Sequence, residues 1–201
     1  MLVKRYNLHE LHSYVWAYND ELKAIDIPVE DNVKLANATN PNIETLRNSI
    51  VPTQLCQIKS NLSFSNDFGI FEIGRVVNGL DENGLCIENK KLAITLYSKT
   101  RNVKDIYFEL RDILAVVTDE IKHKALTFEK AEPTHSYEHP VNLYSVCLDG
   151  RNIGTIGIVH PTVNKKIDKK AAIVFAEIDV NAYANTEAAP VSYTHLTLPT
   201  T

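Results

Sequence analysis

Apolar residues recur with helical spacing along residues 104–123. They fall at i, i+4, i+7, i+8, i+11 and i+15, at positions Ile106, Leu110, Ile113, Leu114, Val117 and Ile121. Because this spacing places all of them on one side of an α-helix, the segment predicts one long amphipathic helix with an apolar stripe facing a core. The carboxylates between them fall mostly on the other side and are typical of a solvated helix face.

A second substantial helix is predicted from apolar positions spaced three to five residues apart, namely Ile50, Leu55, Ile58 and Leu62. Pro52 would lie near its start, where the missing N–H of proline costs little. Residues 19–25 predict a shorter helix with Asn19 or Asp20 as its N-cap.

Runs of β-branched and aromatic residues, several with period-two alternation, predict strands. The clearest is residues 68–77, where alternate side chains face opposite sides of the strand. Further strands are predicted at residues 11–18, 32–37, 91–98, 125–131 and 171–184, the last of these with a helical start.

Three glycines in the stretch "DGRNIGTIGIVHP", residues 149–161, raise the question of a phosphate-binding loop. A dinucleotide-binding loop needs the spacing G-x-G-x-x-G between a strand and a helix, and this stretch differs. It instead joins two β-like runs, residues 144–148 and 152–159, through Asp149-Gly150, which is a strong hairpin signal. Gly154 and Gly157 would then mark a bulge or a close backbone approach.

The predicted elements amount to six or seven strands, mostly joined by short turns, and two substantial helices. Because strands and helices do not alternate regularly, the fold class predicted is α+β, an antiparallel β-sheet flanked by helices. Residues 1–186 are expected to form one domain. Residues 187–201 end in a threonine-rich stretch that breaks the preceding pattern, so we treat them as a non-native or disordered tail.

The composition is that of a soluble globular protein, with 44% hydrophobic and 23% charged residues. A net charge of −4 gives no basic surface for a nucleic-acid backbone. Cys56, Cys86 and Cys147 lie far apart, which argues against a disulfide framework or a structural zinc site and favours a reducing, cytoplasmic setting. No apolar run approaches the ~20 residues that span a bilayer, so no membrane contact is expected.

Local histidine pairs are the main candidates for metal chemistry. His135 and His139 have the i, i+4 spacing of a helical zinc site, but prolines on both sides argue against a helix there. His9 and His12 lack that spacing, so both pairs are interpreted as surface or loop residues and no metal site is predicted. The lysines of residues 165–170 could touch RNA, but a solvated surface is favoured because the chain is acidic overall.

Three short motifs occur in an order and spacing that resemble the central core domain of the phenylalanyl-tRNA synthetase β subunit, over about residues 8–183. The first runs from Asn-Pro through Leu-Arg-x-Ser to a helix, the second reads Phe-Glu-Ile-Gly-Arg-Val, and the third is G-x-x-I-G-x-[IL]-G-x-x-H-P. The matching residues are Asn40, Pro41, Leu46, Arg47, Ser49 and Pro52, then Phe71, Glu72, Ile73, Gly74, Arg75 and Val76, then Gly150, Ile153, Gly154, Gly157, His160 and Pro161.

The resemblance implies a class II aminoacyl-tRNA synthetase-like core that is catalytically silent. In that family the α subunit carries the active site, and class II catalysis uses one arginine in a Phe-Arg-x-Glu strand and another in a Gly-x-Gly-x-x-Arg unit. Here Glu72 takes the place of the first arginine, and the second motif does not occur in the sequence. We therefore expect no catalytic residue and no cofactor in this chain, with ATP and Mg²⁺ bound by the α subunit.

The implied role is architectural. Residues 40–62 resemble the interface helix of the class II fold and would dock on the α subunit of an (αβ)₂ enzyme that joins phenylalanine to tRNA(Phe), with tRNA contacted weakly or not at all by this chain. The implied interface residues are Asn40, Pro41, Leu46, Arg47, Ser49, Pro52 and Leu55, and the implied structural residues are Phe71, Glu72, Gly74, Arg75, Gly154, Gly157, His160 and Pro161.

The sequence also departs from the family. Thr53-Gln54 stands where Gly-Leu is usual, and Val141-Asn142 follows His139-Pro140 where Gly-Arg is common. Two alternatives therefore stay open. One is a stand-alone synthetase-like enzyme, which would catalyse ATP–pyrophosphate exchange. The other is a ligand-binding or regulatory module, which would have a polar-lined pocket over the sheet where the scaffold role predicts an apolar patch around residues 40–62.

Overall fold

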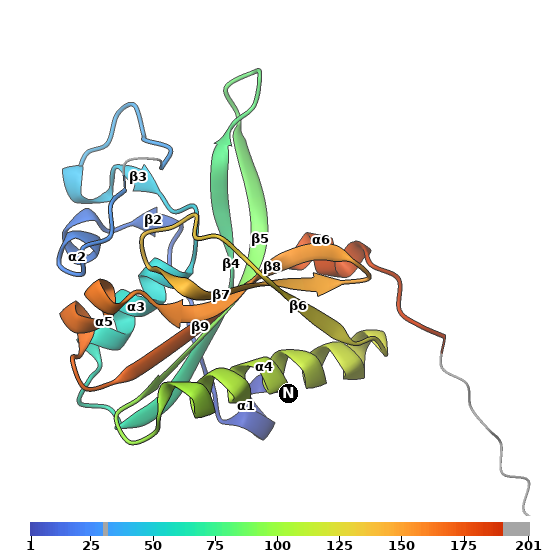
Figure 1. Cartoon of the computed structure of the whole chain (residues 1–201). Helices are drawn as coiled ribbons and strands as arrows, with labels where there is room; N and C mark the ends of the chain where they lie inside the picture. Colours follow the sequence, from blue (N-terminus) through green and yellow to red (C-terminus); the bar gives the residue numbers. More distant parts are fainter. Residues whose placement is uncertain (30–31, 191–201) are drawn as a thin grey trace, which may run out of the picture.

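A seven-stranded sheet divides the molecule, with α3 and α4 packed on its opposite faces (Figure 1). The computed structural model describes residues 1–29 and 32–190. The strand order is β1-β4-β5-β9-β8-β7-β6, and β2 pairs with β3 in a separate small sheet. The strands are β1 (His9–Glu10), β2 (Trp16–Ala17), β3 (Thr45–Leu46), β4 (Asp67–Leu80), β5 (Cys86–Ser98), β6 (Leu126–Lys130), β7 (Glu138–Leu148), β8 (Arg151–Val159) and β9 (Ala172–Asp179).

Two of the helices are long enough to cover a sheet face, and the others are short. The helices are α1 (Leu2–Tyr6), α2 (Asn19–Lys23), α3 (Val51–Ser60), α4 (Val103–Lys122), α5 (Pro161–Ile167) and α6 (Val180–Asn185), with a 3₁₀ turn η1 (Pro41–Ile43). No helix of the described ranges is both long and apolar enough to cross a membrane.

The α+β class is confirmed, but the sheet is mixed. Strand β1 runs parallel to β4, with His9 opposite Ile70, whereas the other pairs of the large sheet are antiparallel. A parallel pair needs a long crossover, which here passes through α2, η1 and α3. Because β1 has only two residues, it is too short to carry a sequence pattern, and the prediction of a purely antiparallel sheet is wrong at this edge.

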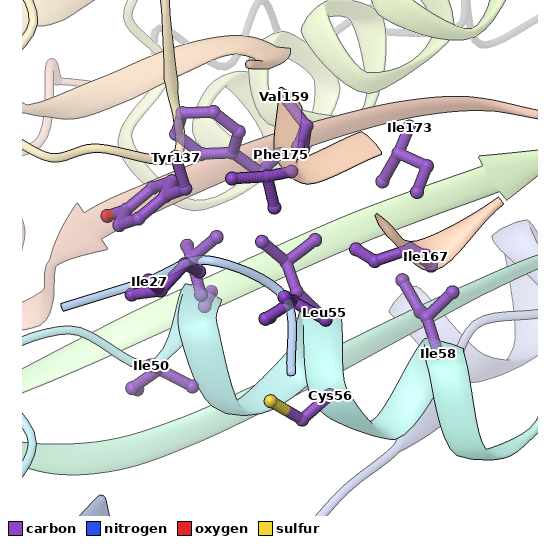
Figure 2. Close-up of a cluster of buried hydrophobic side chains, with 14 of the residues drawn as sticks. Ile27, Ile50, Leu55, Cys56, Ile58, Tyr137, Val159, Ile167, Ile173 and Phe175 are labelled. Carbon is purple, nitrogen blue, oxygen red and sulfur yellow. The ribbon is translucent and has the colours of Figure 1, made fainter. Parts of the chain in front are cut away.

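Two apolar clusters share the sheet. The α3-side cluster packs α3 and α5 against one face, and Figure 2 shows its Leu55 and Ile58 from α3 near Phe175 and Ile173 of β9. The α4-side cluster packs the other face and is built around Ile106, Leu110, Ile113 and Leu114 of α4 with Phe71, Ile94, Ile156, Val174 and Ile178 from the strands. The sheet therefore separates the apolar interior of the expected single domain into two layers.

Most of the long predicted elements are confirmed. Helix α4 begins and ends one residue earlier than predicted, and the four apolar positions in its first three turns are buried. The strands predicted at 68–77 and 91–98 lie within β4 and β5, and the strand predicted at 125–131 contains β6, which is one residue shorter at each end. The β7–β8 hairpin turns at Asp149 and Gly150, whose φ angles of 52° and 73° are the positive values that this turn requires. Helix α3 begins at Val51 with Pro52 in its first turn, as predicted.

The predictions for the first 40 residues are largely wrong. Only Trp16–Ala17 of the predicted strand at 11–18 is a strand, and residues 32–37 contribute a single bridge from Lys34 to Thr45. Residue Tyr18, not Asn19 or Asp20, is the N-cap of α2. The helical turn expected at the start of residues 171–184 comes at the end, as α6. Helix α2 packs on η1 and α3, and β2 pairs with β3 outside the large sheet, so the form of these short elements depends on tertiary contacts.

Of the predicted tail at 187–201, residues 191–201 lie outside the described residues. The amide of Ala189 donates to the carbonyl oxygen of Lys122 at the end of α4, 2.8 Å away. The boundary at residue 186 and the non-native origin of the tail stay predictions.

Candidate functional site at the start of α3

Arg47 and Glu72, from two of the three motifs, form a buried ion pair. The distance from Arg47 Nη2 to Glu72 Oε1 is 2.8 Å, and each side chain is only 3% exposed. Arg47 also donates to Ser13 Oγ (2.6 Å) and, through Nε, to the carbonyl oxygen of Arg75 (3.0 Å), while Ser13 Oγ donates to Glu72 Oε2 (2.7 Å). A buried charge is tolerated when it is paired and fully hydrogen bonded, and both groups meet that condition.

Gly74 makes room for this pair. A Cβ atom built on Gly74 would meet Arg47 Nη2 and Glu72 Oε1, so a larger residue would push the guanidinium away from the strand. Glu72 and Gly74 are two residues apart in β4, so the Glu72 side chain and the Cα hydrogen of Gly74 that a Cβ would replace face the same side of the strand. Three residues of the second motif therefore serve Arg47 of the first motif. Glu72 pairs with its charge, Gly74 leaves room for its guanidinium, and the carbonyl oxygen of Arg75 accepts its hydrogen bond.

Glu177 of β9 forms a second buried cluster at the first turn of α3. Its Oε1 accepts hydrogen bonds from the amide of Ile50 (2.7 Å) and from Ser49 Oγ (2.9 Å), and its Oε2 accepts from Lys91 Nζ (2.7 Å). A carboxylate at this position is favoured by the positive end of the helix dipole. The cluster therefore fixes the start of α3 to strands β5 and β9.

Tyr137 completes the second cluster, with its hydroxyl 2.9 Å from Ser49 Oγ. Burial, together with the negative charge of Glu177, raises the pKa of Tyr137 well above its usual value. The side chain is therefore neutral at physiological pH and acts as a hydrogen-bonding group rather than as a base.

The family departure at Gln54 is accommodated by a polar partner. Gln54 is fully buried, its Nε2 donates to the carbonyl oxygen of Ala93 (3.2 Å), and its Oε1 accepts from Thr95 Oγ1 (2.6 Å). A buried amide costs stability only when it lacks partners. Gln54 thus adds another tie between α3 and β5.

The third motif spans the turn of the β7–β8 hairpin, strand β8 and the start of α5. A Cβ atom on Gly154 would collide with the backbone of Glu177, and one on Gly157 would lie 2.8 Å from Leu143 Cδ1, so both glycines permit close approach of neighbouring strands, as predicted. His160 caps α5 by accepting from the amide of Thr162 (3.2 Å), and Pro161 is the first residue of that helix. The hairpin interpretation is confirmed.

The predicted interface residues divide into two groups. Leu46, Arg47, Ser49, Pro52 and Leu55 are buried within this chain, around the start of α3. Asn40 and Pro41 are exposed at η1, where the Asn40 side chain accepts from the amide of Asn42 (2.9 Å).

The predicted structural residues divide as well. Glu72 and Gly74 belong to the Arg47 cluster, whereas Gly154 lies against the backbone of Glu177 in the neighbouring strand. Phe71 lies on the opposite face, in the α4-side cluster. The Arg75 side chain is 72% exposed and pairs with Glu88 at 2.9 Å, so only its backbone carbonyl takes part in the Arg47 cluster.

Four residues of these clusters were missed by the sequence analysis: Ser13, Lys91, Tyr137 and Glu177. Each lies outside the three motifs and comes from a different part of the chain. No local pattern identifies a residue whose partners are tens of residues away. One signal in the sequence could have identified Glu177. It follows Ile173 and Phe175 at a spacing of two residues, which predicts a charged side chain on the buried face of the strand.

Near the two clusters lie one small polar cavity and two histidines, which are candidate binding residues. A cavity of about 100 Å³ lies beside Arg47, Ser49 and Tyr137. His135 stacks on Tyr137 with ring centroids 5.2 Å apart, and His139 Nδ1 accepts from the amide of Val141 (3.0 Å). Residues 1–29 and 32–190 contain no group of three or more side chains arranged to hold a metal ion. The two clusters as a whole tie α3 to the sheet.

Comparison with known proteins gives one consistent result. Residues 2–180 match the family model described as "Phenylalanyl tRNA synthetase beta chain CLM domain". The chain is 28% identical over 190 residues to the phenylalanine–tRNA ligase β subunit of Bacillus subtilis, covering 89% of this chain and 23% of that protein. It is 29% identical over 178 residues to the Neisseria meningitidis serogroup B β subunit (83% and 22%) and 22% identical over 193 residues to that of Aquifex aeolicus (94% and 24%). The chain thus spans about a quarter of the length of these relatives.

Proposed function

Because this chain belongs to the family described by the phenylalanyl-tRNA synthetase β-chain CLM domain, we propose that it is a non-catalytic structural core of a phenylalanine–tRNA ligase β subunit. Its role would be to dock on a catalytic α subunit in a cytoplasmic (αβ)₂ enzyme that attaches phenylalanine to tRNA(Phe). The α subunit would hold ATP and Mg²⁺, and tRNA would be contacted mainly by other parts of the enzyme. The fold would be the class II synthetase-like core that the motifs resemble.

The observation that carries this proposal is the buried Arg47–Glu72 pair. A catalytic class II strand would present an arginine to ATP, whereas Glu72 points to Arg47 and both groups are sealed from solvent. Removing either from its partner would leave an uncompensated buried charge, which costs about 3–5 kcal/mol. The motif residues therefore support a role in fixing the architecture rather than in binding a substrate.

The proposed docking surface lies where residues 40–62 reach the exterior. Asn40 and Pro41 are exposed at one end of the segment, and Phe64, just beyond the other end, is 62% exposed. Aromatic side chains are enriched at protein interfaces, so we take Phe64 as the candidate anchor. The buried members, such as Arg47 and Leu55, would support docking indirectly by holding the segment in place.

The first test is size-exclusion chromatography with light scattering on residues 2–189, alone and with a phenylalanyl-tRNA synthetase α subunit. We expect a stable heteromeric peak that Phe64→Asp weakens and Phe108→Asp, a change at an equally aromatic exposed position on α4, does not. A folded chain that ignores the α subunit would overturn the proposal.

The ligand-binding module and the stand-alone enzyme, the two alternatives to this proposal, are judged by different observations. The polar cavity beside Tyr137, at about 100 Å³, is smaller than the roughly 300–1,000 Å³ of typical ligand sites, so nothing in its geometry favours a ligand-binding module. ATP–pyrophosphate exchange with phenylalanine measures the enzyme alternative directly, and we expect no exchange above background for this chain alone.

A further inference from the structure

An apolar groove of about 520 Å³ lies on the α4 face of the sheet. Its floor includes Ile73 of β4 and Leu92 of β5, and one wall is formed by Val117 and Ile121 of α4. Val3 of α1 and Tyr183 of α6 line the other sides. Three of the apolar side chains that line the groove are exposed in this domain, namely those of Ile73, Ile121 and Val3.

The groove exists because one helix is too narrow for this sheet. A helix with its side chains is about 10–12 Å wide, whereas seven strands about 4.8 Å apart form a much wider face. Helix α4 contacts mainly β9, β5 and β8, and Figure 1 shows it crossing the face obliquely. Among the described residues, only the short helices α1 and α6 lie beside the neighbouring surface, so its apolar side chains Ile73 and Ile121 stay partly uncovered.

The geometry favours a helix as the occupant. The groove opens over the face of the sheet, not along its edge, so a segment lying there finds no row of backbone partners. Its backbone must satisfy its own hydrogen bonds, which a helix does. A helix beside α4 would also complete the layer that packs on this face.

We propose that this groove is filled by an amphipathic helix from the part of the β subunit that lies outside this chain. The relatives are about four times longer than the region matched here. Met1, Leu2 and Val3 line the groove, and Ala189 is hydrogen bonded to Lys122, next to the groove residue Ile121. Polypeptide joined to either side of this domain would therefore start near the groove. Such a tethered segment acts at millimolar effective concentration and needs little affinity of its own.

Cysteine labelling in the full-length β subunit tests the proposal. Ile121 and Phe108 lie on the same helix and are 53% and 51% exposed in this domain, but only Ile121 lies in the groove. The variants Ile121→Cys and Phe108→Cys would each be treated with a maleimide, and the labelled peptide followed by mass spectrometry over time. We expect labelling at position 121 to be at least tenfold slower than at position 108 in the β subunit without α.

Other outcomes would overturn the inference. Equal rates at the two positions, whether both are fast or both slow, would mean that no segment covers the groove specifically. Protection that appears only after the α subunit is added would assign the groove to that partner instead. Because the labelling is measured without α, these results do not depend on whether the proposed docking on α is correct.

A second measurement addresses the helical form of the occupant. The variant Ile73→Cys, carrying a photoactivatable cross-linker, would be irradiated in the same full-length subunit. We expect cross-links to β-subunit residues outside this domain spaced three or four apart, as on one face of a helix. Cross-links at alternate residues, or only to tRNA or α in the holoenzyme, would contradict the proposal.

Discussion

At the scale of single residues, two arginines show what the sequence does and does not reveal. Arg47 and Arg75 both belong to family motifs, and each pairs with a glutamate, Glu72 and Glu88. The Arg47–Glu72 pair is buried in the interior, whereas the Arg75–Glu88 pair is exposed to solvent. Because the energy of an ion pair depends on its surroundings, the two must differ sharply in their effect on stability.

We predict that Arg47→Met lowers the free energy of unfolding by about 3–5 kcal/mol, since it leaves the Glu72 carboxylate buried without its partner. The matched change Arg75→Met should cost less than about 1 kcal/mol, as an exposed pair contributes little. Urea unfolding followed by circular dichroism measures both. The double change Arg47→Met with Glu72→Leu should regain part of the loss, because it removes both charges. Similar costs for the two single variants would show that the buried pair is not as the structure describes it.

The thiol of Cys56 gives the protein a pH dependence. Burial, with an added contribution from the negative charge of Glu21, raises the pKa of Cys56 to about 12. Because the folded pKa exceeds the unfolded value, the stabilisation of the thiol form is complete below about pH 9 and is lost as pH rises from about 9 to 12. We predict that between pH 8 and 10 the wild type loses roughly 1–2 kcal/mol more than Cys56→Ala. Parallel stability curves for the two proteins would contradict this.

At the scale of elements, the segments predicted well are those that carry a long, regular pattern. Helix α4 presents an apolar stripe along its length, and β4 contains the predicted strand at 68–77, whose neighbouring residues Ile70 and Phe71 belong to the two different apolar clusters. The β7–β8 hairpin is specified by Asp149-Gly150. By contrast, β1, β2 and β3 have two residues each, and a pair of residues has no periodicity. Such short strands form because neighbouring segments hold them.

The hairpin turn provides the prediction at this scale. Gly150 has φ 73° and no atom lies within 4 Å of a Cβ built on it, so Gly150→Ala should lose stability only through backbone strain. We predict a cost of about 1–2 kcal/mol, measured by urea unfolding. The neighbouring change Arg151→Ala, at an exposed position, should stay within about 0.5 kcal/mol. No loss in Gly150→Ala would indicate a turn of a different type.

At the scale of the whole molecule, the single sheet couples the two apolar clusters. Leu55 belongs to the α3-side cluster and Leu110 to the α4-side cluster, and both are fully buried. The strands between them contribute alternate residues to each cluster, so neither layer can form alone. This arrangement is expected to unfold as one unit.

We predict that Leu110→Ala and Leu55→Ala each lower the free energy of unfolding by about 2–5 kcal/mol and keep a single transition. Trp16, the only tryptophan of the chain, lies in β2 next to Ala17 of the α3-side cluster. Its fluorescence should report Leu110→Ala, on the opposite face, with the same midpoint shift as far-ultraviolet circular dichroism. A shift in circular dichroism alone would mean that the two faces unfold separately.

The sequence by itself determined the α+β class, the long helix, the main strands and the hairpin, because periodicity and turn chemistry are local properties. Its motifs also identified the family to which the chain belongs. Only the tertiary structure decided what those motif residues do, since Arg47 and Ser49 find their partners Glu72 and Glu177 tens of residues further along the chain. It also decided that one edge strand runs parallel and that an apolar groove remains beside α4. Both follow from how the elements pack in three dimensions, which local spacing does not encode.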